Sequence, residues 1–249
     1  MNRTTNSSLL VFDQGNTLVK LGLYVNHELI EQRQFDTLAA KDLATYVEHV
    51  QTSYEDCGFF GISSGDVKAL PDVLQNACAT SAELCGPLTM AYKTPDTLGM
   101  DRLAMAASAY LEHKEDVLVV TMGTCITYNI VKNGAFIGGA ISPGWAMRYR
   151  AMHAFTAGLP LAHYQETTPL VGTDTDESLR AGVDIAIAQE VDGMIRQYCK
   201  VNVIKSVVLC GGDAKRLSKP LKNYIFAPVN YELYALKRLH EYIQTTGPL

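Results

Sequence analysis

The first 113 residues alternate between short apolar runs typical of strands and longer stretches with helical spacing. Continuous or alternating apolar runs predict strands over residues 9–12, 18–24, 28–35 and 58–63. Apolar positions at helical spacing predict helices over residues 39–50, 67–77 and 102–113, the last of them rich in alanine. Strands and helices interleaved in this way indicate an α/β fold.

The rest of the chain follows the same alternation. Buried-type runs predict strands over residues 117–120, 126–131, 135–141 and 207–209, with an Asn-Gly hairpin signal at residues 133–134. Helical patterns cover residues 145–155, 177–198 and 231–243, and the longest of them follows a Thr/Asp-rich stretch typical of a helix start.

The opening pattern occurs twice. Residues 9–17 and residues 118–125 each place an apolar strand before a glycine-centred turn, and each is followed by two further strands. Such self-similarity indicates two related halves, residues 1–114 and 115–249, facing each other across a cleft. No Gly/Ser/Pro-rich linker separates them, so we expect tightly packed halves.

Composition excludes several classes of function. The net charge of −5 over 249 residues gives no basic field for a nucleic acid. The polar first eight residues precede an apolar run too short for a signal peptide or a membrane span, so we expect a cytoplasmic protein. The six cysteines show neither Cys-x-x-Cys pairs nor zinc spacing, which favours reduced cysteines.

The turn after the first strand has the composition of a phosphate-binding loop. We call residues 13–20 the first loop; they read Asp13, Gln14, Gly15, Asn16, Thr17, Leu18, Val19 and Lys20. A tight turn at Gly15 exposes backbone N–H groups that suit the oxygens of a triphosphate, and Lys20 adds a cation. Asp13, at a strand end, could hold Mg²⁺ through water. An ordinary hairpin turn remains the alternative.

Two further glycine turns could serve the same ligand. The second loop, residues 121–125, contains Gly123 and Thr124 and would face the phosphates from the other half. Gly211 and Gly212 follow a strand, where the absence of side chains would let the backbone approach a nucleoside. Each pair alone is equally compatible with a plain turn.

The helix start at residues 99–102 could bind the substrate that accepts the phosphoryl group. Gly99 permits close approach of a substrate, and the helix N-terminus favours an anion. Asp101 could accept the proton of an attacking hydroxyl, and Arg102 could hold a carboxylate or phosphate. The alternative makes Asp101 a helix cap and Arg102 a surface cation.

Together these motifs resemble type III pantothenate kinases, which phosphorylate pantothenate at the start of coenzyme A synthesis and share the fold of acetate kinase, sugar kinases, Hsp70 and actin. The resemblance covers almost the whole chain. The matching positions are Asp13, Gly15, Asn16, Thr17, Lys20, Tyr92, Gly99, Asp101, Arg102, Gly123, Thr124, Gly138, Gly139, Ile141, Pro143, Gly144, Thr175, Leu179, Gly182, Gly211 and Gly212.

The resemblance implies a fold and a set of roles. The fold would be two similar ribonuclease H-like (actin-like ATPase) halves with mixed sheets flanked by helices, the first carrying the first loop and substrate motif, the second carrying the second loop and a dimer helix. Asp101 would be the general base on the pantothenate hydroxyl. ATP would bind the first loop and Thr124, with Mg²⁺ held near Asp13. Pantothenate would contact Tyr92, Gly99, Met100, Asp101, Arg102 and, from the partner subunit of a homodimer, Thr175.

One position departs from the family pattern. The family usually has an aspartate just before the second loop, where it binds a monovalent cation, commonly K⁺, and this chain has Thr121. A neutral hydroxyl is a poorer cation ligand than a carboxylate, so a requirement for K⁺ or NH₄⁺ is an open question. Two other functions remain: a regulatory protein that binds nucleotide or pantothenate without turnover, and a kinase of another small hydroxylated substrate.

Overall fold

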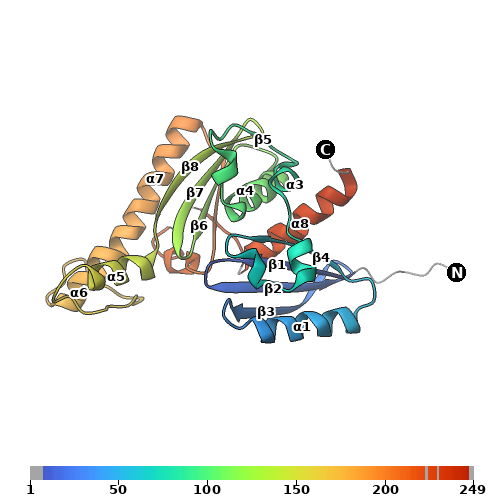
Figure 1. Ribbon diagram of the computed structural model, residues 1–249. Coiled ribbons are helices and arrows are strands. Elements are labelled where there is room, and N and C mark those ends of the chain that lie inside the picture. Colours follow the sequence, from blue (N-terminus) through green and yellow to red (C-terminus); the bar gives the residue numbers. More distant parts are fainter. Residues whose placement is uncertain (1–7, 222–223, 229, 247–249) are drawn as a thin grey trace. The chain divides into compact units, whose positions relative to one another are not determined.

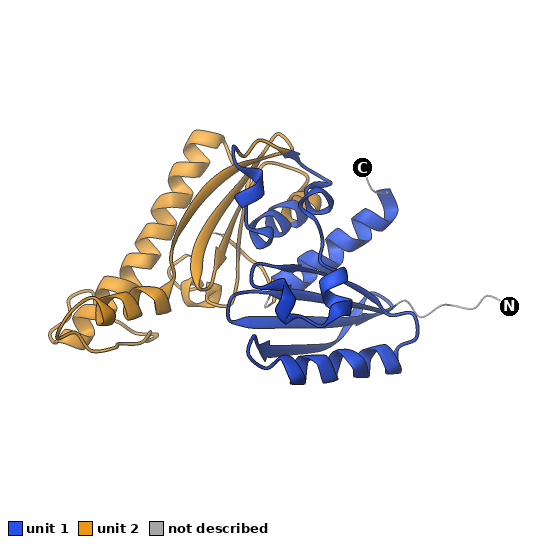
Figure 2. Cartoon of the chain, viewed as in Figure 1, with its two compact units in different colours: residues 1–89, 93–108, 232–249 blue, residues 90–92, 109–231 orange. Residues whose placement is uncertain are grey.

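The computed structural model describes residues 8–221, 224–228 and 230–246, and they form two compact units (Figures 1 and 2). Unit 1 comprises residues up to 89, 93–108 and from 232 onward; unit 2 comprises residues 90–92 and 109–231. Unit 1 is discontinuous along the chain, because all but the first residue of the closing helix belongs to it. Most of the polar N-terminal stretch lies outside the described residues.

Unit 1 is built on a four-stranded mixed sheet in the order β3-β2-β1-β4. The strands are β1 (Ser8–Gln14), β2 (Leu18–Val25), β3 (Glu28–Asp36) and β4 (Gly58–Ser63). β1, β2 and β3 form an antiparallel meander, and β4 lies parallel to β1. The helical elements of this unit are α1 (Ala40–Ser53), η1 (Val67–Ala69), α2 (Asp72–Asn76), α3 (Ser81–Cys85), η2 (Pro95–Thr97), most of α4 (Met100–His113) and nearly all of α8 (Tyr231–Thr246).

Two helices cover opposite faces of this sheet. Leu43, Val47 and Val50 of α1 are buried against the face that carries Leu10 and Phe12. Each such side chain contributes about 1.5–3 kcal/mol on burial. α8 lies against the opposite face, where ring centroids of Phe60 and His240 are 5.3 Å apart. Asp13 belongs to this second face, because side chains alternate along β1.

Unit 2 contains a six-stranded sheet in the order β10-β9-β6-β7-β8-β5. Its strands are β5 (Thr89–Met90), β6 (Val117–Met122), β7 (Cys125–Lys132), β8 (Ala135–Pro143), β9 (Ser206–Cys210) and β10 (Ile225–Phe226). Its helical elements are α5 (Trp145–Ala154), α6 (Thr175–Arg180), η3 (Ala181–Ile185), α7 (Ala186–Asn202) and η4 (Ala214–Leu217). β6, β7 and β8 form an antiparallel meander, and β9 lies parallel to β6.

The two sheets therefore share one topology, since each has a three-stranded meander with a parallel strand beside its first strand. This bears out the internal repeat and the α/β fold of two similar halves with mixed sheets. The Asn-Gly hairpin is also confirmed: Asn133 and Gly134 have φ of 51° and 71°, the left-handed pair that a two-residue hairpin needs.

Two helix predictions need correction. The helix predicted over residues 67–77 is divided into η1 and α2, because Pro71 precedes α2 and forces Leu70 into an extended conformation with ψ of 153°. The helix predicted over residues 177–198 begins at Thr175, ends at Asn202 and passes through the π-helical segment η3. Within it, Val183, Ile187, Val191 and Ile195 join the core of unit 2.

Candidate functional site

The first loop is a tight turn between β1 and β2. The backbone N–H of Gly15 donates to the Leu18 carbonyl at 2.9 Å, which closes the turn. Asn16 and Thr17 are exposed at its tip, whereas Gln14 is buried. The Gln14 side chain accepts from the Ser63 hydroxyl at 2.7 Å and donates to the Asp66 carbonyl at 3.0 Å. The neighbouring turn after β4 thus fixes the base of the loop.

The charged ends of the loop lie on one face of the sheet. Asp13 and Lys20 are direct partners in the β1–β2 register. The Lys20 ammonium forms an ion pair with the Glu232 carboxylate at the start of α8. Burial raises the pKa of the Asp13 carboxyl to about 7; the nearby Glu232 and Asp101 carboxylates add to the rise, and Lys20 opposes it. Ionised Asp13 is therefore a costly group that a cation would stabilise.

The predicted substrate motif lies in the same unit. Gly99 immediately precedes α4, and its carbonyl accepts from the Leu103 N–H at 3.2 Å. Asp101 is partly exposed in the first turn, where the Ser64 hydroxyl donates to Oδ1 at 3.4 Å. Arg102 is 6% exposed. Ser64 also donates its backbone N–H to the Gln14 carbonyl at 2.7 Å, so unit 1 brings the first loop and the Gly99–Arg102 segment near each other.

Two glycines pack closely against the backbone of the second loop. Gly144, just before α5, donates its N–H to the Thr124 carbonyl at 3.0 Å, and a Cβ on Gly144 would lie 2.1 Å from the Gly123 carbonyl oxygen. Gly211 has φ of +95°, and a Cβ there would lie 2.3 Å from the Met122 carbonyl oxygen. Both glycines are thus required by backbone packing. For Gly211 this reason differs from the predicted approach to a nucleoside.

Thr121, at the position where an aspartate was expected, has two neutral partners on the neighbouring strands. Its hydroxyl lies 3.4 Å from the Cys210 sulfur, and its register partners are Thr127 on β7 and Cys210 on β9. Thr124 is exposed at the tip of the second loop.

The other two predicted substrate residues also belong to unit 2. Tyr92 packs edge-on against Phe136 with ring centroids 5.9 Å apart, and its ring lies over Gly138, where a Cβ would come within 3.2 Å. The pairing of residues 89–91 with the edge of β8 explains why Tyr92 leaves unit 1: the Ala91 N–H donates to the Phe136 carbonyl at 3.1 Å.

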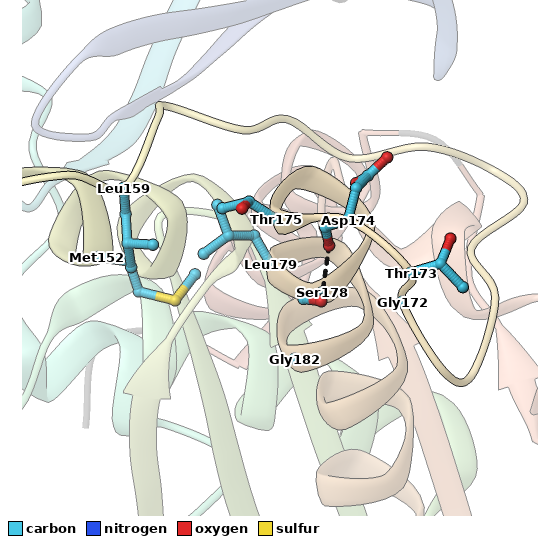
Figure 3. A pocket seen from close by; sticks show the side chains of 9 residues that line it. All are labelled: Met152, Leu159, Gly172, Thr173, Asp174, Thr175, Ser178, Leu179 and Gly182. Carbon is cyan, nitrogen blue, oxygen red and sulfur yellow. Dashed lines mark hydrogen bonds between the residues drawn. The ribbon is translucent and has the colours of Figure 1, made fainter.

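Thr175 is exposed at the first turn of α6 and lines a separate pocket of about 510 Å³ (Figure 3). The Asp174 side chain caps α6 by accepting from the Glu177 N–H at 2.8 Å. The pocket is lined by Met152, Leu159, Gly172, Thr173, Asp174, Thr175, Ser178, Leu179 and Gly182. None of the other predicted site residues lines it. The structure of one chain therefore leaves Thr175 in a pocket of its own.

A buried network supports that region. The Tyr149 hydroxyl donates to Oδ1 of Asp184 at 2.7 Å, and the Thr168 hydroxyl donates to its Oδ2 at 3.1 Å. Asp184 lies in η3, where the wider π-helical turn interrupts the regular helix. This carboxylate ties α5 and the following loop to the long helix.

The residues that sequence reasoning missed are Glu232 and Ser64. Glu232 lies 212 positions after Lys20, and its only local signal was a place in the first turn of a predicted helix. Ser64 lies in a turn of small residues after β4. Neither belongs to a motif that could have identified it.

Comparisons with known proteins identify the family. A family model described as type III pantothenate kinase matches residues 9–197. A type III pantothenate kinase of Christiangramia forsetii is 36% identical over 245 residues, which cover 95% of this chain and 99% of that protein. One of Flavobacterium johnsoniae is 34% identical over 241 residues, covering 94% and 98%. The chain belongs to the type III pantothenate kinase family. The resemblance inferred from the motifs is confirmed, and nothing in these relatives favours a regulatory protein.

Solved structures support the fold of this type III pantothenate kinase family member. A Campylobacter jejuni protein described as a Baf family transcriptional activator aligns with a TM-score of 0.62 at 19% identity, covering 96% of this chain and 100% of that one. Component A of (R)-2-hydroxyglutaryl-CoA dehydratase from Acidaminococcus fermentans aligns with a TM-score of 0.51 at 15% identity, covering 94% and 97%. At such identities the similarity shows the fold alone. Among the described residues, no helix is long and apolar enough to cross a membrane.

Proposed function

We propose that this chain transfers the γ-phosphoryl group of ATP to the hydroxyl of pantothenate, giving 4'-phosphopantothenate, the first step of coenzyme A biosynthesis. Membership of the type III pantothenate kinase family carries this proposal, since the relatives align over 94–95% of the chain. The proximity of the first loop and Asp101 within unit 1 supports it, because phosphoryl transfer needs a phosphate cradle near a base.

Asp101 acts as the general base in this proposal. Its carboxylate accepts the proton of the attacking hydroxyl, and the Ser64 hydroxyl, 3.4 Å from Oδ1, helps to orient it. Lys20 and the N–H groups of the first loop, residues 13–20, stabilise the charge that develops on the γ-phosphoryl oxygens, together with Thr124 of the second loop. Positioning and electrostatics therefore supply most of the rate enhancement.

The residues around Asp13 fit a hydrated magnesium ion. Asp13 offers hard carboxylate oxygens, and because burial disfavours its ionised form, that form would be stabilised by a nearby cation. We infer that the ion would be held through water, because Mg²⁺ usually keeps several of its water ligands. When bound, Mg²⁺ would neutralise charge on the ATP phosphates.

Pantothenate would contact Tyr92, Gly99, Met100 and Arg102, with the Arg102 guanidinium reaching its carboxylate. We infer that Thr175 completes this site from the partner subunit of a homodimer. The separate Thr175 pocket, which none of the other predicted site residues lines, supports a role across subunits.

For the monovalent cation we propose that no tight K⁺ or NH₄⁺ site exists at Thr121. Its hydroxyl and the Cys210 thiol, 3.4 Å apart, are neutral and are poor ligands for such an ion.

A coupled ADP-release assay with pantothenate tests the function. We expect turnover, similar rates in K⁺, NH₄⁺ and Na⁺, and loss of turnover in Asp101→Asn with ATP binding retained. No turnover with pantothenate in any of the three salts would refute the proposed function. Turnover only with a sugar in its place would assign a different substrate, and full activity of Asp101→Asn would refute the role of the base.

A further inference from the structure

α8 contacts three alternate residues of β2 along one face of the sheet. Lys20, Gly22 and Tyr24 alternate on β2 and share this face. The Lys20 ammonium pairs with Glu232, and a Cβ on Gly22 would lie 3.3 Å from Cδ1 of Leu233. Farther along, the ammonium of Lys237 lies 5.8 Å from the Tyr24 ring centroid. The missing side chain at Gly22 lets the helix approach closely, which brings its first turn to Lys20.

Lys20 therefore has two carboxylates within reach. Asp13 lies directly opposite it on β1, and cross-strand partners have Cβ atoms about 4.5–5.5 Å apart. The Lys20 side chain is 22% exposed and the Glu232 side chain 11%, so their ion pair is partly shielded from water and its attraction is stronger than that of a surface pair. In this structure α8, rather than the neighbouring strand, provides the ion-pair partner of the lysine.

We propose that Glu232 is a positioning residue of the nucleotide site: it holds the Lys20 ammonium and so leaves the Asp13 carboxylate available to a hydrated divalent cation. This rests on the proposed function only in assuming that the first loop binds a nucleoside triphosphate with its metal. Without Glu232, Lys20 would turn to Asp13, and the resulting ion pair would compete with the cation for the same oxygens.

The test measures binding rather than turnover. A non-hydrolysable ATP analogue is titrated by calorimetry into the full chain, once in EDTA and once in saturating Mg²⁺. The dissociation constant in EDTA divided by that in Mg²⁺ is the Mg²⁺-dependent ratio, which measures how much the ion strengthens binding. We expect Glu232→Gln to reduce this ratio about tenfold or more, as loss of a partner that orients a metal ligand does. Glu232→Asp, which keeps the charge, should recover part of the loss.

A second substitution separates positioning from damage to the fold. In the double variant Lys20→Met/Glu232→Gln no ammonium is left to pair with Asp13, so the Mg²⁺-dependent ratio should return toward the wild-type value although total affinity falls. Lys20→Met alone should keep the ratio while weakening nucleotide binding in EDTA; this variant tests the proposal even if Glu232→Gln fails to fold.

Glu241→Gln is the matched control. It removes a carboxylate from the same helix, where Glu241 pairs with Lys237 at 3.0 Å and with His27 at 2.6 Å, and it should leave the ratio unchanged. An unchanged ratio in Glu232→Gln, or a double variant no better than Glu232→Gln, would overturn the proposal while nucleotide binding by the wild type stands. No binding of the analogue to the wild type would refute the proposed function and this role with it.

Discussion

The contact between Gly144 and the second loop gives a quantitative prediction. A methyl group at Gly144 would lie 2.1 Å from the Gly123 carbonyl oxygen and 2.9 Å from that of Thr124. Real Cβ atoms do not come within 3.0 Å of such atoms, so Gly144→Ala must move the loop by about 0.9 Å (3.0 minus 2.1). That shift would also strain the 3.0 Å hydrogen bond from the Gly144 N–H to the Thr124 carbonyl.

The expected effects are separable. Overpacking of this size costs about 1–3 kcal/mol, which lowers the Tm of a chain of this length by roughly 2–12 °C. A displacement of about 1 Å in a positioning loop can cost on the order of 100-fold in rate. We therefore expect kcat/KM for ATP to fall by about 10- to 100-fold while the far-ultraviolet circular dichroism spectrum stays unchanged.

Steady-state kinetics with varied ATP and a thermal melt measure both effects. Gly193→Ala in α7 is the control, because its Cβ would meet nothing within 4 Å. It should leave kinetics unchanged and stabilise the helix by up to about 1 kcal/mol. If Gly144→Ala kept both the wild-type Tm and the wild-type kcat/KM, the close approach described here would be wrong.

Two further predictions concern stability. Tyr149→Phe removes the 2.7 Å hydrogen bond to the buried Asp184 carboxylate and should lower the free energy of unfolding in urea by about 1.5–3 kcal/mol; a loss under about 0.5 kcal/mol would contradict this. The pKa of Asp13 is raised from 3.8 to about 7, so ionising this carboxyl destabilises the folded protein. This destabilisation is absent below pH 3.8, grows as the pH rises and reaches its full value above pH 7. Asp13→Asn should therefore stabilise the ligand-free protein by up to about 3 kcal/mol more at pH 8 than at pH 5, and equal gains in melts at the two pH values would exclude a raised pKa.

The sequence predicted what depends on neighbouring residues. The meanders of both sheets and the Asn133-Gly134 hairpin follow from local alternation and turn chemistry, so their repetition was visible along the chain. The break in the helix predicted over residues 67–77 was missed because the helical spacing of apolar residues continues past Pro71. The π-helical segment η3 was also missed; it contains Asp184, whose hydrogen bond with Tyr149 spans 35 positions that no local pattern encodes.

Some residues of the candidate site could likewise be predicted from the sequence, and others needed the structure. Asp13, Lys20 and Asp101 were found because they lie in short motifs. Glu232 was not found, because its partner Lys20 is 212 positions away and an acidic residue in the first turn of a helix is common. The roles of Gly144 and Gly211 likewise needed coordinates, since both are determined by the backbone of the second loop rather than by the residues next to them.

The assignment of α8 to unit 1 also has a consequence for biosynthesis. Unit 1 lacks its last part until residue 232 and those after it have been made, about 124 residues after residue 108 (232 minus 108). At about 5–20 residues per second, ribosomes need roughly 6–25 s for that stretch. During this delay the face of the nascent sheet that bears Asp13 and Lys20 lacks α8. Chaperones that recognise exposed apolar strands are therefore expected to act on this interval, and a chain that terminates early would leave that face uncovered.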